Sequence, residues 1–297
     1  RPLSRLASAL ALGLACGLAG CQRQAGNPSL SASNNQLVVA SKNRIDTVDP
    51  AGAYTFGAMQ LLSAIGDPLY AIAPGGQIQP KLAVALPQVS ADGLTVRVAL
   101  RQGVRFHDGT PFTADDVVFS LNRAAGEGSD MRSNTNDIKE VRKINSHTIE
   151  IETKSPFPIL PNVLSTVFIM SKKWCEDNQA TRPVDRRRGI ENAASFRANG
   201  TGPYRLRERQ PNIRTTFVRN GNYWGKIDGN VDEVIFSVIA NDPTRVAALL
   251  SGEIDIMEPV PVQDVPRING SPNTVALVAP ELRTIFLGMD QKRDELL

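Results

Sequence analysis

Residues 94–121 read LTVRVALRQGVRFHDGTPFTADDVVFSL, and they place a strand, a turn and a helix start in close succession. Four apolar residues, at every second position from Leu94 to Leu100, alternate with Thr, Arg and Ala, and Arg101 follows. Such alternation is typical of a strand with one buried face and one wet face. The first part of the stretch therefore predicts a half-buried strand.

The second part of the stretch predicts a helix that follows a turn. Asp108 and Gly109 are a turn pair, and Thr113 is a residue type that caps helices well. The carboxylates of Asp115 and Asp116 then fall in the first helical turn, where the helix dipole stabilises them. We therefore interpret both acidic residues as helix-start residues.

Further strands and helices are predicted on both sides of this stretch. Upstream, Leu37–Ala40 predicts a buried strand, and apolar residues at helical spacing between Met59 and Ile65 predict a helix. Downstream, Val141–Ile144 and Thr148–Glu152 predict a hairpin with alternating faces. The middle of the chain is thus expected to be rich in strands.

From about residue 200 the pattern changes to strand, helix, strand. Val234–Ile239 and Ile254–Ile256 have the composition of buried strands. The helix between them is expected to begin near Asn241 or Asp242 and to end at Gly252, a plausible C-cap. This unit predicts an α/β region.

Composition indicates an ordinary globular chain. Of its 297 residues, 41% are hydrophobic and 21% charged, and the length favours two domains. The chain has 33 basic and 30 acidic residues. Removal of the N-terminal segment described next, which contains Arg1 and Arg5, would leave 31 basic residues. This balance gives no electrostatic case for nucleic-acid binding, so we expect no nucleic-acid partner. We interpret the basic run Arg186–Arg188 as a solvated loop.

The N-terminal segment has the pattern of an export signal. Arg1 and Arg5 precede Leu6–Gly20, an apolar stretch of 15 residues, whereas a membrane span needs about 20. The alternative, a buried N-terminal helix, is less favoured because residues 22–36 read as a polar, flexible tether. We expect residues 1–21 to be a signal peptide, and the sequence to begin inside it.

The cysteines support an exported, lipid-modified protein. Leu18 to Cys21 reads LAGC, which resembles the bacterial lipobox, and that resemblance implies lipidation at Cys21. Cys16 would be discarded with the signal, so Cys175 would remain as a single thiol. A single thiol makes no intramolecular disulfide, and the mature fold must depend on core burial.

An ordered series of short motifs resembles the family-5 extracellular solute-binding proteins. The motifs recur in that family in the same order, and they cover residues 37 to 290. The residues that carry the likeness are Ile78, Pro80, Leu82 and Ala83; Leu100, Arg101, Gly103, Val104 and Phe106 to Pro111; Thr113 to Val117; Gly200 to Tyr204; Tyr223 to Gly225; and Ser251 to Asp255.

The resemblance implies an α/β clamshell of the type II periplasmic-binding-protein kind, with an inserted strand-rich domain. Residues 37–60 and 190–285 would form lobe I, and residues 61–189 the inserted domain II. Residues 286–297 would begin the hinge into lobe III, which is largely missing from this chain. The chain is therefore expected to be an N-terminal fragment.

The resemblance also implies a ligand site and partners. The ligand would be a peptide or another small solute, held by Tyr54, Thr55 and Phe56, by Met257, Glu258 and Pro259, and by Phe286, Gly288 and Asp290. The family usually has Asn where Asp290 stands, and an aromatic residue shortly after Leu82 and Ala83, where this chain has Val84 to Leu86; both departures concern ligand preference. The protein would deliver its ligand to the permease subunits of an ABC importer as a periplasmic monomer, held at the membrane by its lipid anchor.

A secreted hydrolase, either a glycosidase or a peptidase, is the alternative. Asp115 with Asp116, or Glu253 with Asp255, could form a carboxylate pair for acid/base chemistry. Helix-start and strand-start positions explain these carboxylates better. We interpret His107 as a turn residue, and with only two histidines in the chain we expect no metal, no cofactor and no catalytic residue.

Overall fold

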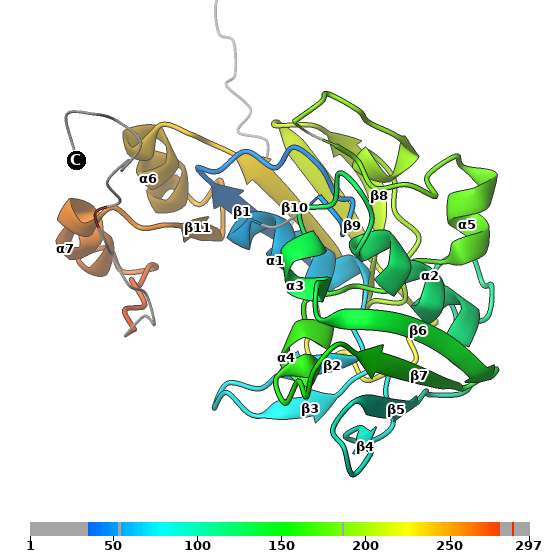
Figure 1. Cartoon of the computed structure of the whole chain (residues 1–297). Helices are drawn as coiled ribbons and strands as arrows, with labels where there is room; N and C mark the ends of the chain where they lie inside the picture. Colours follow the sequence, from blue (N-terminus) through cyan, green and yellow to red (C-terminus); the bar gives the residue numbers. More distant parts are fainter. Residues whose placement is uncertain (1–34, 53–54, 186, 280–286, 288–297) are drawn as a thin grey trace, which may run out of the picture. The chain divides into compact units, whose positions relative to one another are not determined.

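A mixed five-stranded sheet organises one part of the chain (Figure 1). The computed structural model describes residues 35–52, 55–185, 187–279 and 287. The strand order is β11-β1-β10-β9-β8. Strand β1 runs parallel to β10 and β11, whereas β9 is antiparallel to β10 and to β8. The strands span Gln36–Ser41 (β1), Tyr204–Gln210 (β8), Arg214–Arg219 (β9), Glu233–Val238 (β10) and Ile256–Glu258 (β11).

Helices cover both faces of this sheet. Helix α1 (Phe56–Ile65) shares a hydrophobic cluster with Val39 of β1, whereas α6 (Asp242–Ser251) shares another cluster with Val38 and Ala40. Because neighbouring residues of a strand point to opposite faces, α1 and α6 lie on opposite sides of the sheet. The predicted first strand and first helix are confirmed.

The helix after β10 is confirmed, but the strand after it begins later than predicted. Asn241 caps α6, and Gly252 ends it with a left-handed backbone (φ 76°). Strand β11 starts at Ile256 rather than Ile254. Ile254 is 4% exposed and packs in the α6 cluster, while Asp255 accepts the backbone N–H of Val38 on its carboxylate at 2.7 Å.

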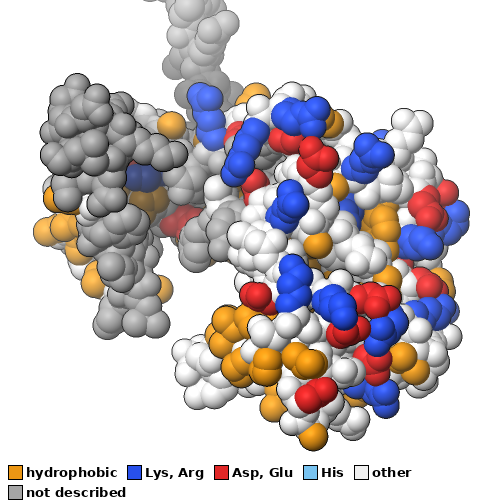
Figure 2. Space-filling view, in the orientation of Figure 1, with side chains coloured by type: hydrophobic (Ala, Val, Ile, Leu, Met, Phe, Trp, Pro, Cys, Tyr) orange, Lys and Arg blue, Asp and Glu red, His pale blue; other side chains and the backbone are white. Residues whose placement is uncertain are grey.

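An antiparallel four-stranded sheet, in the order β4-β5-β7-β6, forms the strand-rich part. Its strands span Gln88–Val89 (β4), Thr95–Ala99 (β5), Ile138–Asn145 (β6) and Thr148–Thr153 (β7). Val96, Val98, Ile149 and Ile151 are buried in one cluster, so both predicted alternations are confirmed. The opposite face carries ion pairs such as Arg97 with Glu150 at 2.7 Å, and Figure 2 shows basic and acidic side chains interspersed over this region.

Helix α2 (Ala114–Ala124) begins as the sequence predicts. The backbone N–H of Thr113 donates to the carboxylate of Asp116 at 2.9 Å, which closes a capping box. Val117 and Leu121 pack into the core of the four-stranded sheet. The remaining elements are β2 (Tyr70–Ile72), β3 (Ile78–Pro80), α3 (Arg132–Thr135), α4 (Leu160–Leu164), α5 (Lys172–Asp177), α7 (Val265–Asn269) and two 3-10 turns, Ala193–Ser195 and Val262–Asp264.

Cys175 is buried and free, and burial raises the pKa of its thiol to about 12. Every helix in the part of the chain that the structure describes is too short or too polar to cross a bilayer. The predicted segment 1–21, most of the tether 22–36 and all of 286–297 except residue 287 lie outside the described residues. The boundaries of lobe I and domain II stay predictions.

Candidate functional site

The carboxyl ends of three parallel strands meet at one edge of the five-stranded sheet. Ser41, the last residue of β1, pairs with Val238 of β10 on one side and with Glu258 of β11 on the other. The ladder continues one step further, because Ile239 N donates to Ser41 O at 2.9 Å and Lys42 N donates to Glu258 O at 3.3 Å. We call these strand ends, residues 41–42, 238–239 and 258–259, the carboxyl edge.

The connections that leave the carboxyl edge diverge. The chain after β1 leads to α1 on one face of the sheet, and the chain after β10 leads to α6 on the other face. In open α/β sheets, ligands bind outside the carboxyl ends of strands at the point where the connections separate to opposite faces. The topology therefore singles out this edge as the candidate binding site.

Helix α1 brings two of the predicted segments together. Thr55 caps the helix by accepting the N–H of Ala58 at 3.4 Å, and Phe56 is its first residue. One turn further, Gln60 Nε2 donates to Glu258 Oε2 at 2.9 Å. The N-terminal half of α1 is thus joined to the end of β11.

The other predicted residues have different positions. The structure places the Met257 side chain in the α6 cluster, 7% exposed, so it faces the core. Pro259 is exposed, and its carbonyl lies at the carboxyl edge. The remaining predictions, Tyr54, Phe286, Gly288, Asp290 and the lipidation residue Cys21, lie outside the described residues.

Arg245 of α6 holds the backbone of the carboxyl edge. The sequence did not predict this role. The Arg245 side chain is 0% exposed, and its guanidinium donates to the carbonyls of Ile239 at 2.8 Å and Pro259 at 3.1 Å. It also pairs with Asp242 at 2.5 Å. One side chain therefore fixes the backbone at two of the three strand ends.

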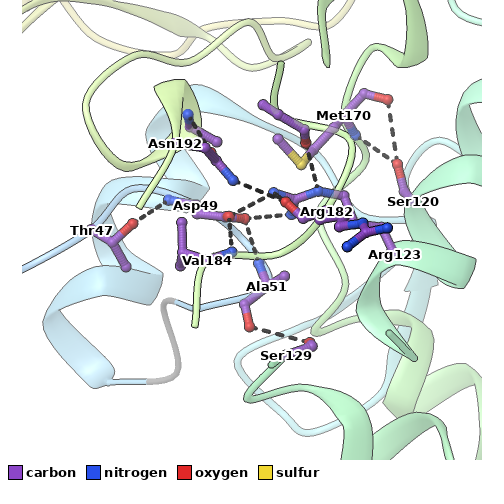
Figure 3. Close-up of polar contacts among 12 residues, drawn as sticks. Thr47, Asp49, Ala51, Ser120, Arg123, Ser129, Met170, Arg182, Val184 and Asn192 are labelled. Atoms are coloured by element: carbon purple, nitrogen blue, oxygen red, sulfur yellow. Dashed lines mark hydrogen bonds and ion pairs between the residues drawn. The ribbon is translucent and has the colours of Figure 1, made fainter. Parts of the chain in front are cut away.

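The loop between β1 and α1 is anchored by a buried ion pair. Asp49 and Arg123 of α2 form a bidentate pair at 2.5 and 2.6 Å, with side chains 0% and 2% exposed (Figure 3). Sequence reasoning missed this pair too. Arg123 lies 74 residues after Asp49 in the chain, so no local pattern links the two.

Both members of this pair make further hydrogen bonds. Asp49 accepts the backbone N–H groups of Ala51 at 2.9 Å and Val184 at 3.1 Å, while Arg123 donates to the carbonyls of Ala180 at 3.0 Å and Arg182 at 2.8 Å (Figure 3). Buried charges are tolerated when they are paired and hydrogen-bonded in this way. The loop that precedes α1 is thereby tied to α2 and to residues 180–184.

Three of the four carboxylates considered for hydrolysis have structural partners. Asp115 pairs with Lys143 at 2.6 Å, and Asp116 closes the capping box, where burial raises the pKa of its carboxyl. The carboxylate of Asp255, just before β11, accepts the backbone N–H of Val38 on β1. Glu253 is exposed. The described residues bring together no group of three or more His, Cys, Asp or Glu side chains placed to hold a metal ion.

His107 bridges two segments of backbone. Its ring Nδ1 accepts the N–H of Gly200 at 3.4 Å, so Nε2 carries the proton and donates to the carbonyl of Gly202 at 3.1 Å. Burial lowers the pKa of His107, which keeps the imidazole neutral. The interpretation of His107 as a turn residue agrees with these contacts.

Comparison with known proteins gives a consistent result. The sequence profile of "Bacterial extracellular solute-binding proteins, family 5 Middle" matches residues 77–296. The chain is 26% identical over 285 residues to the glutathione-binding protein GsiB of Salmonella typhi, which covers 94% of this chain and 51% of that protein. The chain spans about half the length of the curated relatives it matches.

Solved structures show the same fold. NikZ from Campylobacter jejuni, in complex with Ni(L-His), is 24% identical with a TM-score of 0.71, over 81% of this chain and 46% of that one. DppA from Helicobacter pylori, in complex with the peptide STSA, is 25% identical with a TM-score of 0.69, over 80% and 49%. The predicted α/β fold of the type II periplasmic-binding-protein kind is confirmed, and the partial coverage agrees with the expectation that lobe III is largely missing.

Proposed function

Because this chain belongs to the bacterial extracellular solute-binding proteins of family 5, we propose that it forms one side of the ligand site of an ABC importer's substrate-binding protein. The observation that carries the proposal is the carboxyl edge, where the ends of β1, β10 and β11 align beside the start of α1. The edge offers backbone N–H and C=O groups to which a ligand can form hydrogen bonds. The carboxylate of Glu258 is already held by Gln60, so it is positioned to contact a ligand.

The proposed ligand is a peptide or a related small solute. GsiB is named for glutathione, DppA was solved with a tetrapeptide and NikZ with Ni(L-His). Strand β11 lies at the end of its sheet, and an extended ligand can add to such a strand through backbone hydrogen bonds. Thr55, Phe56, Glu258 and Pro259 are the proposed contacts from the described residues, and Tyr54, Phe286, Gly288 and Asp290 from the rest of the chain.

The proposal includes closure by a second lobe and anchoring to the membrane. A single lobe covers one side of a ligand, whereas such sites enclose roughly 70–90% of it, so this chain by itself is expected to bind weakly. Lipidation at Cys21 would hold the protein at the membrane face of the periplasm, where it would pass its ligand to the permease subunits. Mass spectrometry of the protein from its native host tests the anchor, and an unmodified Cys21 contradicts it.

A thermal-shift screen of the full-length gene product tests the ligand class. Dipeptides, oligopeptides, glutathione, nickel chelates and oligosaccharides are compared at equal concentration. A ligand at 100 times its Kd adds about 2.7 kcal/mol to the free energy of unfolding, which is readily seen as a rise in Tm. Peptides or glutathione are expected to raise Tm, and a shift with sugars alone contradicts the assignment.

A matched pair of variants tests the place of binding. Glu258→Lys breaks the contact with Gln60 at the carboxyl edge, whereas Glu253→Lys makes the same charge change at an exposed position outside the edge. We expect at least a tenfold loss of affinity in the first variant and little change in the second, measured by calorimetry on the full-length product. Equal affinities in both variants would place the ligand elsewhere.

Hydrolysis is not favoured as the function. Asp115, Asp116 and Asp255 are each engaged in a structural contact. Incubation of the full-length product with peptides and glycosides should therefore leave them intact. Turnover that Asp116→Asn abolishes would replace the binding function by the hydrolase.

A further inference from the structure

A groove of about 740 Å³ runs along α2, in the region predicted as domain II. This volume lies within the range of ligand sites, about 300–1,000 Å³. The groove is lined by α2, by Glu127, by Lys143 of β6, by Lys172 of α5, and by Thr181, Arg182, Pro183, Asp185, Arg188 and Ile190. None of its lining residues belongs to the carboxyl edge, so it is a separate feature of the surface.

One face of α2 forms a wall of the groove. Asp115, Val118, Phe119 and Asn122 are spaced i, i+3, i+4 and i+7, which puts them on one side of the helix, and the wall continues to Gly126. Seven helical residues rise by about 10 Å, a length that three extended residues match at about 3.3 Å each. The continuation to Gly126 adds room for one or two more.

Four apolar side chains line part of the groove. Val118 and Phe119 of α2 are half-buried, and Pro183 is buried. Ile190 is 45% exposed beside them. Such a surface can accept the aliphatic side chain of a ligand that lies along the helix.

The acidic side chains of the groove already have partners. Asp115 pairs with Lys143 at 2.6 Å, and Glu127 lies 3.5 Å from Arg188. The carboxylate of Asp185 accepts the backbone N–H of Arg188 at 3.1 Å. These contacts leave each carboxylate with at least one neighbouring donor.

The side chains of two cations of the groove make no hydrogen bond within the described residues. Lys172 Nζ lies 3.8 Å from Glu176 Oε1, beyond hydrogen-bond reach. The carbonyl of Arg182 is held by Arg123, but within the described residues its guanidinium makes no hydrogen bond or ion pair. These two side chains therefore keep positively charged donors available to a ligand.

We propose that the groove along α2 binds an extended acidic segment, three to five residues long, of a partner protein. Lys172 and Arg182 would pair with its carboxylates, and an aliphatic side chain would lie on Phe119 and Ile190. The carbonyl bond to Arg123 fixes the backbone of Arg182 while its guanidinium stays available, which suits a guanidinium that receives a carboxylate. The site does not depend on the ligand proposed for the carboxyl edge.

Fluorescence anisotropy with a fluorescein-labelled acidic pentapeptide, ELELE, tests the proposal on the full chain. We expect saturable binding that weakens as salt is raised, and no binding of the basic counterpart KLKLK. The double variant Lys172→Glu with Arg182→Glu should weaken binding at least tenfold. Lys154→Glu with Arg187→Glu makes the same change of net charge at exposed residues outside the groove and should leave binding within about twofold.

Several outcomes would overturn the proposal. Equal losses in the two double variants would mean unspecific attraction to the whole protein. Displacement of ELELE by an equal concentration of N-acetylglutamate would mean a site for single carboxylates. A dimer that dissociates only in the groove variant, seen by light scattering, would mean that a second copy covers the groove. Glu258→Lys should leave ELELE binding unchanged, which separates this site from the carboxyl edge.

Discussion

The two loops that flank α1 are each held by a buried aspartate, but the partners of the two aspartates differ. Asp49 precedes the helix, is 0% exposed and faces the guanidinium of Arg123, which is itself buried. Asp67 follows the helix and is 1% exposed. Its closest partners are neutral donors, the hydroxyl of Thr201 at 2.9 Å and the indole N–H of Trp224 at 2.9 Å.

A cation completes the surroundings of Asp67 at longer range. Lys81 Nζ lies 3.4 Å from its carboxylate, with a side chain 34% exposed, and donates to the hydroxyl of Tyr223 at 3.0 Å. Although burial alone lowers the pKa of Lys81, its contacts with Tyr223 and Asp67 raise it overall. The charge of Asp67 is therefore balanced by several groups, each of which contributes a part.

The difference is one of charge balance: a single guanidinium balances the charge of Asp49 before the helix, whereas several groups share the balance of Asp67 after it. Removal of one member of a buried ion pair leaves an unpaired charge in a medium of low dielectric. Removal of one donor among several leaves the carboxylate with its other partners. Because the start of α1 lies at the carboxyl edge, the edge depends on Arg123, a residue of the strand-rich part.

Arg123→Met should have the largest effect on stability. It leaves Asp49 buried without a counter-ion, and such a loss costs about 3–5 kcal/mol in the free energy of unfolding. Urea unfolding followed by circular dichroism measures it. Arg97→Met, which removes an exposed ion pair of β5, is the control and should cost about 1 kcal/mol or less.

A second variant checks the cause of that loss. Asp49→Asn combined with Arg123→Met removes the unpaired charge and should be more stable than Arg123→Met alone. If the double variant is less stable, or if Arg123→Met costs no more than Arg97→Met, the loop does not depend on the ion pair.

Trp224→Phe should have the next largest effect. It removes the indole N–H that donates to Asp67 at 2.9 Å but keeps an aromatic ring at the position. A hydrogen bond to a charged group contributes about 1.5–3 kcal/mol, and the remaining donors of Asp67 limit the loss to that range. Urea unfolding is again the measurement.

Trp174→Phe is the matched control for this variant. Trp174 is also half-buried, and its indole N–H has no hydrogen-bond partner within the described part of the chain. Its replacement should therefore cost less than that of Trp224. Equal losses would show that Trp224 contributes by packing alone.

The sequence predicts those parts of the fold whose signals are local. The alternation from Val96 to Leu100, the cap at Thr113 and the C-cap at Gly252 each depend on residues within one element, and each is confirmed. The start of β11 was misplaced by two residues because a buried Ile254 looks the same whether it packs under a helix or in a strand. Tertiary packing decides between those two cases.

The candidate site could be predicted only in part. The segments at Thr55 and Glu258 were predicted by resemblance, and the structure brings α1 and β11 together through Gln60, which carried no sequence signal. Arg245 and Arg123 each contact residues that lie outside their own helix and far from them in the sequence. Neither hydrophobic periodicity nor turn-forming residues can predict such long-range contacts.

Lys81→Met should have a smaller effect than Trp224→Phe. The aliphatic stem still packs, and the lost ion pair is partly exposed, so screening reduces the cost to about 0.2–1 kcal/mol. The difference between wild type and variant should shrink further at 1 M salt, where the Debye length is about 3 Å. A loss as large as that of Arg123→Met would remove the distinction between the two aspartates.

The smallest expected effect is a dependence on pH at the Asp67 end of α1, through His107. The Gly200–Gly202 backbone packs against the last turn of α1, where a Cβ on Gly200 would lie 2.2 Å from the carbonyl of Ile65. His107 holds this backbone in its neutral form, and a proton on Nδ1 would face the N–H of Gly200 instead of accepting it. Burial lowers the pKa of His107, and Arg205 adds to that, whereas the hydrogen bond to Gly202 and the charges of Asp67 and Asp108 oppose it.

Because the folded state has the lower pKa, the unfolded state binds more protons at His107 below about pH 6.5, the ordinary value for histidine. The stability that His107 contributes is therefore complete above pH 6.5 and falls as the pH is lowered toward its folded pKa. His107→Gln keeps a donor and an acceptor without titrating, so its free energy of unfolding should change less between pH 7 and pH 5 than that of the wild type. His147→Gln, at the other histidine, should follow the wild type, and parallel curves for all three proteins would show that His107 does not couple the end of α1 to pH.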